Sequence, residues 1–217
     1  MTFTGFAIGL IVIVLGLSLH EFGHALAADR LGDPGPRAAG RLTIRPDRHM
    51  ELFGFVFIVI TLYAGFGLGW AKPVMVNPRW FRRPKRDMML VALAGPAMNL
   101  AQALAFALAL RLLFVVAPVF YGHAALAAFI LRICAAGVIL NIALMLFNLL
   151  PIFPLDGSKV VAGLMPDRMS MAWTAFGQRY GALCLIGLFL LGGRLLGNTL
   201  EPATFHLARL LMPAGLF

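Results

Sequence analysis

The sequence predicts an all-α polytopic membrane protein, with residues 1–217 forming a single integral-membrane domain. Hydrophobic residues make up 61% of the 217 positions, and the mean hydropathy is +0.89. A soluble domain of this size could not bury so much apolar surface, so lipid must surround much of the chain. The positive charges fall mainly in two stretches, 30–48 and 72–86, as they do in the cytoplasmic loops of membrane proteins.

This distribution of charge also bears on the partners and the location. The net charge of +9 suits anionic lipid headgroups and does not indicate nucleic acid. Cys134 and Cys184 lie in apolar segments, so neither a disulfide framework nor a cysteine metal site is predicted. The excess of arginine over lysine is typical of a GC-rich bacterial gene. We therefore expect a multi-pass protein of a bacterial inner membrane.

The first apolar run, residues 3–28, is long enough to span the roughly 30 Å hydrocarbon core as a helix. No basic residue precedes it and no small-residue cleavage site follows it, so we expect a retained helix that starts outside the cell. Apolar and polar residues alternate over 40–45, which predicts a short strand, and residues 74–76 predict another. Between them, the apolar run 52–70 has a glycine-rich end and is barely long enough to span.

The rest of the chain predicts mostly helix. Long helices are expected over 88–116, 124–150 and 171–196. A turn is expected at 118–123, and a short helix at 158–164 follows two prolines that break the second long helix. Residues 202–212 place apolar side chains around a histidine and an arginine, which predicts an interfacial tail.

The first helix contains the motif His20-Glu21-Phe22-Gly23-His24. Residues four apart on a helix share a face, so the two imidazoles can bind one zinc ion. The Glu21 carboxylate sits beside that face and can take a proton from a water on the zinc. A chance match to so short a motif is the alternative. Charged side chains at membrane depth cost roughly 2.5–3.5 kcal/mol each on insertion scales, which favours a functional reason for them.

Asp156 is the best candidate for the third protein ligand that a catalytic zinc site usually has. It follows a helix broken by two prolines, and irregular backbone at membrane depth is tolerated only where it is buried in protein or lines a cavity. The alternative role for Asp156 is an N-cap of the short helix that follows. His49, His123 and His206 lie in loop, turn or interface sequence, and structural or solvent roles are expected for them.

These motifs resemble those of the site-2 protease family of intramembrane zinc metalloproteases. The resemblance rests on the motif His20–His24, on Gly95-Pro96-Ala97-Met98-Asn99, and on the stretch Asn148-Leu149-Leu150-Pro151-Ile152-Phe153-Pro154-Leu155-Asp156-Gly157. It covers about residues 5–165 and is closest to small bacterial members without PDZ or CBS domains. Residues 167–217 would then form a C-terminal helix and the interfacial tail.

The resemblance implies that His20, His24 and Asp156 bind one zinc ion per chain and that Glu21 activates water. It also implies that Asn148 holds the substrate backbone and, as a hydrogen-bond donor, helps to stabilise an oxyanion. The alternative for Asn148 is a helix–helix hydrogen bond, which asparagine often makes in membrane bundles.

The implied activity is that of a zinc metalloendopeptidase, cutting in or near a transmembrane segment of a single-pass membrane protein. A metal-ion or proton transporter is the alternative, since intramembrane His, Glu and Asp side chains also build ion pathways. Against it, the sequence shows no inverted repeat of the transporter type, and a glutamate next to a two-histidine pair suits hydrolysis. A catalytically dead scaffold is disfavoured because every chemical residue is present.

Counting membrane crossings predicts how the run 52–70 lies. The two histidines are near the end of one helix and Asp156 follows the end of another, so a shared zinc requires both helices to run in the same direction. The helices over 88–116 and 124–150 supply two crossings, and a third would put Asp156 on the wrong side. We therefore expect 52–70 to be a re-entrant segment on the cytoplasmic side, with the active site toward the cytoplasm. The two predicted strands would offer an extended substrate an edge near the site.

Overall fold

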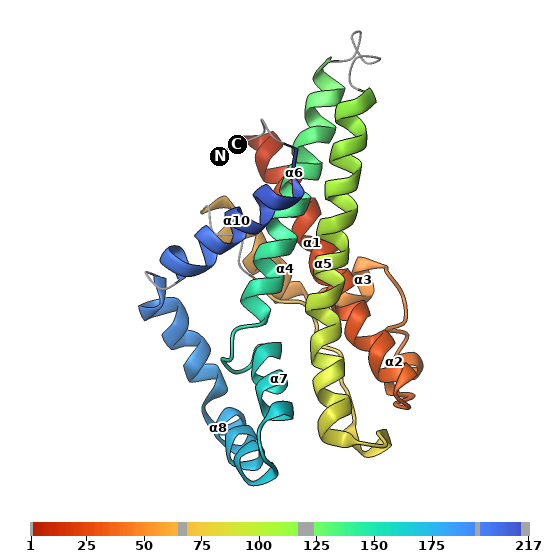
Figure 1. Ribbon diagram of the computed structural model, residues 1–217, viewed down its shortest axis with the longest axis vertical. Coiled ribbons are helices and arrows are strands. Elements are labelled where there is room, and N and C mark those ends of the chain that lie inside the picture. Colours follow the sequence, from red (N-terminus) through yellow and green to blue (C-terminus); the bar gives the residue numbers. More distant parts are fainter. Residues whose placement is uncertain (1, 65–68, 117–123, 194–195, 214–217) are drawn as a thin grey trace.

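A computed structural model shows the chain as a bundle of helices (Figure 1), and it describes residues 2–64, 69–116, 124–193 and 196–213. The helices in chain order are α1 (Phe3–Arg30), α2 (Gly35–Ala38), α3 (Pro46–His49), α4 (Leu52–Tyr63), the 3-10 turn η1 (Pro78–Trp80), α5 (Pro84–Val116), α6 (Ala124–Asn148), α7 (Asp156–Leu164), α8 (Asp167–Leu191), the π-helical turn η3 (Leu196–Leu200) and α10 (Glu201–Leu211). The predicted turn at 118–123 and residues 65–68 of the predicted glycine-rich end lie outside the described residues.

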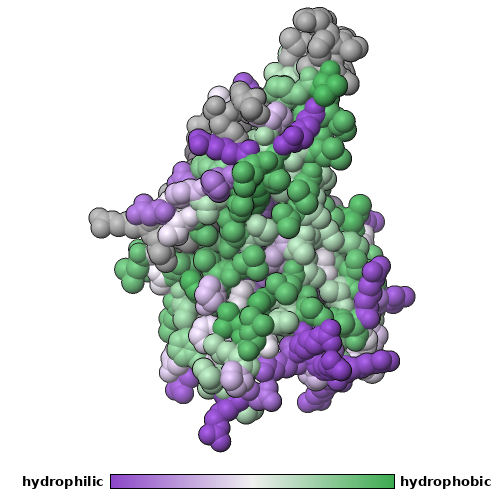
Figure 2. All heavy atoms as spheres, in the orientation of Figure 1, coloured by the Kyte–Doolittle hydropathy of each residue, from purple (hydrophilic) through white to green (hydrophobic). Residues whose placement is uncertain are grey.

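Three of the described helices are long and apolar enough to cross a membrane, namely α1, α5 and α6. α5 and α6 pack along each other, and α1 crosses both (Figure 1). On the face shown in Figure 2, hydrophobic side chains cover most of the middle, while hydrophilic ones gather along the lower edge and the right side and again near the upper end. The chain is therefore an all-α, multi-pass membrane protein, as the sequence predicts.

Small side chains let α5, α6 and α10 pack closely. The shared core contains Ala103 and Ala107 of α5, Val138 and Ile142 of α6, and Ala208 of α10. The three alanines in this core are small enough to allow helix backbones to approach each other in a membrane bundle. The predicted tail is thus the helix α10, and one face of it is buried against α6.

The strand predicted for 40–45 is wrong, and the described residues contain no strand. The segment satisfies its backbone locally, since Arg41 N donates to Pro36 O at 2.9 Å and Arg45 N to Thr43 Oγ1 at 3.3 Å. The alternating pattern put the isoleucine inside, yet Ile44 is 63% exposed and Arg41 is buried. Two carbonyl oxygens, those of Arg48 and Lys72, accept hydrogen bonds from the Arg41 guanidinium. This pairing explains why a charged side chain takes the inside position.

The strand predicted for 74–76 is also wrong, although the chain there is free of helix. Backbone donors at its start and just after its end go to side chains. Val74 N donates to Glu21 Oε2 at 3.0 Å and Asn77 N donates to Asp33 Oδ2 at 2.7 Å. Both acceptors come from α1 or the turn after it, so the segment is tied alongside the C-terminal end of α1.

The two ends of the segment that contains α4 lie together. Lys72 N, after the segment, donates to His49 O, before it, at 2.7 Å. His49 is fully buried, and its Nε2 donates to Thr43 O at 2.7 Å, which is a structural role as expected. Burial lowers the pKa of His49, so its imidazole is neutral at pH 7. α4 itself packs against α1 through Ile58 and Leu62.

Candidate active site

His20 and His24 project from one face of α1 and are both buried. α5 crosses α1 at this level, and it carries a glycine where the two rings lie. A Cβ added at Gly95 would be 2.5 Å from His24 Nε2 and 2.6 Å from His20 Cε1. Likewise a Cβ at Gly23 would be 2.7 Å from Ala94 O. Both glycines are therefore needed so that α5 can approach α1 with the imidazoles between them.

Asp156 reaches the same place from the other end of the chain. α6 ends at Asn148, and α7 begins at Asp156 after a turn. A Cβ added at Gly157 would be 2.2 Å from Leu149 O, so only glycine lets α7 start so close to the end of α6. The residue in the N-cap position of α7 is Leu155, and no side chain caps this helix. The N-cap alternative for Asp156 is therefore excluded.

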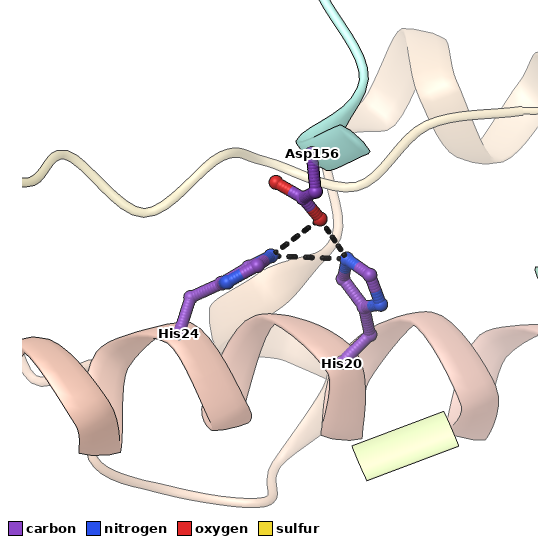
Figure 3. A group of neighbouring side chains, drawn as sticks. All are labelled: His20, His24 and Asp156. Atoms are coloured by element: carbon purple, nitrogen blue, oxygen red, sulfur yellow. Dashed lines mark hydrogen bonds and ion pairs between the residues drawn. The ribbon is translucent and has the colours of Figure 1, made fainter. Parts of the chain in front are cut away.

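Three side-chain atoms of these residues converge (Figure 3). Asp156 Oδ2 lies 3.1 Å from His20 Nε2 and 3.0 Å from His24 Nε2, and the two Nε2 atoms are 3.0 Å apart. All three side chains are buried. Among the described residues, this is the one cluster of three or more His, Cys, Asp or Glu side chains that could hold a metal ion. The structure thus brings together the three residues that the sequence predicts as ligands.

The protonation of these groups fits a bound cation. His24 Nδ1 lies 2.7 Å from Val91 O, and because a carbonyl oxygen only accepts, Nδ1 carries the hydrogen. A neutral His24 then presents a bare lone pair at Nε2, and an ionised Asp156 also presents only lone pairs. A tetrahedral zinc with bonds of about 2.0–2.2 Å holds its ligand atoms roughly 3.3–3.6 Å apart. The observed separations are slightly shorter, and the two-nitrogen, one-oxygen donor set is one that zinc favours.

Glu21 lines a cavity of about 350 Å³ next to this cluster. Its Oε2 accepts a hydrogen bond from Val74 N at 3.0 Å, which fixes the carboxylate at the cavity wall. The rest of the cavity wall comes from α1, α5, the end of α6, the start of α7 and the segment after Ala71. The residues that line it besides Glu21 are His20, His24, Pro73, Val74, Met75, Val76, Met88, Val91, Ala92, Asn148, Pro154, Leu155, Asp156 and Lys159.

Asn148 is half-buried at the wall of the same cavity, so the structure places both predicted catalytic residues there. Its Nδ2 donates to Leu144 O at 2.9 Å, one turn earlier in α6. This bond lies within a single helix, so it is not the helix–helix hydrogen bond that the sequence left open as the alternative.

Sequence reasoning missed Lys159. Its Nζ lies 3.2 Å from Asp156 Oδ1, the carboxylate oxygen that faces away from the histidines. The pairing leaves Oδ2 alone to face the two imidazoles. The i, i+3 spacing of the two residues on α7 was the available signal, because side chains at that spacing are neighbours on a helix.

Residues 115–192, which include Asn148 and Asp156, match the model of a family described as Peptidase family M50. "Putative zinc metalloprotease YwhC" of Bacillus subtilis (strain 168) is 35% identical over 182 residues, covering 82% of this chain and 78% of that protein. "Putative zinc metalloprotease Rip2" of Mycobacterium tuberculosis (strain ATCC 25618 / H37Rv) is 35% identical over 179 residues, and the match covers 82% of this chain and 64% of that protein. No solved structure gives a significant match.

Proposed function

The chain belongs to the site-2 proteases, peptidase family M50, and on this premise we propose that it hydrolyses a peptide bond in or near a transmembrane segment of a single-pass membrane protein. The family makes it a zinc metalloprotease. Two observations support an intramembrane site: His20, Glu21 and His24 lie on α1, a helix apolar enough to cross a membrane, and the Asp156 carboxylate converges on the two histidines.

In this proposal His20, His24 and Asp156 hold one zinc ion per chain. Zinc bound there supplies Lewis acidity, which brings the pKa of a water toward about 7 and polarises a carbonyl group. Glu21 Oε1, the oxygen that does not accept from Val74 N, accepts the proton of the attacking water and returns it to the leaving amine. The hydrogen bond from Val74 N–H keeps the other oxygen, Oε2, in place while Oε1 transfers the proton.

Asn148 is proposed to hold the substrate backbone. One amide hydrogen is committed to Leu144 O, and the side chain lies at the wall of the cavity that Glu21 lines. A peptide must be locally unwound before its scissile amide is accessible, because a helix satisfies its amides internally. The non-helical segment Pro73–Val76 lines the same cavity and replaces the two predicted strands as the backbone beside which an extended substrate would lie.

The test of this activity is a comparison of membrane-protein fragments in cells that carry either the wild-type chain or Glu21→Gln. Fragments that end within predicted transmembrane segments should accumulate with the wild type and be absent with the variant. A fragment pattern that is the same in both cells would rule out the proposed protease activity in that cell.

We further propose that the segment between His49 and Lys72 is re-entrant. α4 has 12 residues and so a length of about 18 Å, short of the roughly 30 Å hydrocarbon core. The hydrogen bond from Lys72 N to His49 O holds both ends of the segment at one level. The basic stretches on either side favour the cytoplasmic side for that level, and so for the active site.

Cysteine labelling tests this topology. In a background without Cys134 and Cys184, single cysteines at Arg37 and Arg83 should be protected from a membrane-impermeant thiol reagent in intact cells and labelled in inverted vesicles. A cysteine at Thr2, the opposite end of α1, is the matched control and should be labelled from outside. Labelling of position 37 or 83 from outside would mean that the segment spans the membrane.

A further inference from the structure

Behind the proposed zinc ligand His20, a chain of hydrogen bonds crosses three helices. It runs from Asn141 on α6 through Asn99 on α5 to His20 on α1, and both asparagines are fully buried. Buried amides among apolar helices are costly unless their donors and acceptors are paired. The function proposed above uses neither asparagine.

The direction of each hydrogen bond in this chain is fixed by two backbone carbonyls, which can only accept. Asn141 Nδ2 donates to Gly137 O at 2.9 Å, so its Oδ1 faces Asn99. Asn99 Nδ2 donates to this oxygen at 3.0 Å and to Gly16 O at 3.2 Å. Both amide hydrogens of Asn99 are thereby used. Its Oδ1 is left facing His20 Nδ1 at 2.6 Å.

The tautomer of His20 follows from that arrangement. Asn99 Oδ1 only accepts, so His20 Nδ1 must carry the hydrogen, and the neutral ring is left with a lone pair at Nε2. This lone pair is the one that faces Asp156 Oδ2 and His24 Nε2. If the Asn99 amide were reversed, its NH₂ group would face Nδ1 and favour the hydrogen at Nε2, which blocks metal binding.

We infer that Asn99 is a positioning residue that holds His20 in its metal-binding tautomer and orientation, and that Asn141 holds Asn99. This inference rests on the proposed role of His20 as a zinc ligand. Outer partners of metal-binding histidines commonly change metal affinity by about 10- to 100-fold when they are removed. Asn99 does not line the cavity, so it would affect zinc binding only through His20.

The test measures zinc affinity of the full chain in detergent, by competition with a chromophoric chelator. Asn99→Leu keeps the volume and removes the acceptor, and zinc affinity should fall by about 10- to 100-fold. Asn99→Asp keeps an acceptor for Nδ1 and removes both donors, so zinc affinity should stay close to wild type while the thermal stability falls. Binding by Asn99→Asp as weak as that by Asn99→Leu would overturn the inference, because packing alone would then explain both.

Gln102→Met is the matched control. Gln102 is on α5 like Asn99, and its Nε2 donates to the same Gly16 O at 3.4 Å, but the described hydrogen bonds of His20 do not include Gln102. Its replacement should leave zinc affinity unchanged. If Asn99→Leu fails to fold, Asn141→Leu serves instead: it removes one of the two acceptors that orient the Asn99 amide and should weaken zinc binding more than Gln102→Met does. Equal zinc binding by the control and by either leucine variant would overturn the inference.

His20→Ala separates this inference from the proposed function. Loss of zinc by His20→Ala, together with wild-type binding by Asn99→Leu, would reject the role of Asn99 and leave the ligand set standing. Full zinc binding by His20→Ala would reject the ligand set, and the role of Asn99 with it.

Discussion

Replacement of Glu21 by glutamine should leave zinc bound and reduce peptide cleavage by about 10²- to 10⁴-fold, the usual contribution of a general base. Glu21 contributes no atom to the cluster of His20, His24 and Asp156, so metal binding has no reason to fall. Glutamine retains a carbonyl oxygen that can accept the hydrogen bond from Val74 N, which keeps the cavity wall in place. Elemental analysis of the purified variant and cleavage of a transmembrane peptide in liposomes measure the two properties.

Glu51→Gln is the matched control for this variant. Glu51 Oε2 accepts from Trp70 Nε1 at 2.7 Å, and the residue is not part of the cavity wall. Glutamine can still accept that bond, so cleavage should stay at the wild-type rate. Cleavage by Glu21→Gln within tenfold of the wild type would mean that another group takes the proton.

Replacement of Asp156 by alanine should remove both zinc and activity. The substitution takes away the one oxygen among the three converging atoms and leaves two imidazoles, fewer ligands than a catalytic zinc site typically has. Activity should fall at least as far as in Glu21→Gln, and His20→Ala and His24→Ala should behave in the same way. Zinc content of the purified chain distinguishes these variants from Glu21→Gln, which keeps the metal.

The control for the ligand variants is Asp167→Asn. The Asp167 carboxylate is 86% exposed and accepts from Lys85 Nζ at 2.8 Å, at the start of α8. An exposed ion pair contributes little to stability, so this variant should fold, bind zinc and cleave as the wild type does. Full zinc content in Asp156→Ala would show that Asp156 is not the third ligand.

Local sequence periodicity was enough to predict the long helices and the helix face that the two histidines share. Membrane-spanning helices need long apolar runs, and a helix places His20 and His24 on one face whatever packs against it. The third residue, Asp156, could be found because the chain around it breaks a helix at membrane depth. Their convergence in the structure agrees with those predictions, while their roles as ligands stay a prediction for zinc analysis to test.

The predicted strands failed because a strand depends on a partner that the local pattern does not specify. The alternation over 40–45 is present in the sequence, but no neighbouring strand lies beside it among the described residues. Arg41 is buried there instead, because its guanidinium donates hydrogen bonds to the carbonyl oxygens of Arg48 and Lys72. Such long-range pairing overrides a weak propensity.

The sequence by itself determined the membrane class and the family, and it predicted the residues that would carry the chemistry, because these depend on composition and on motifs that are local in the sequence. Only the tertiary structure decided what surrounds them. Val74 N–H holds Glu21 across 53 residues, and Asn99 meets His20 across 79. Hydrogen bonds between residues so far apart in sequence need the tertiary structure to bring their partners together. For Asn99 and His20 this is the packing of α5 on α1, which depends on glycines such as Gly95 at the crossing.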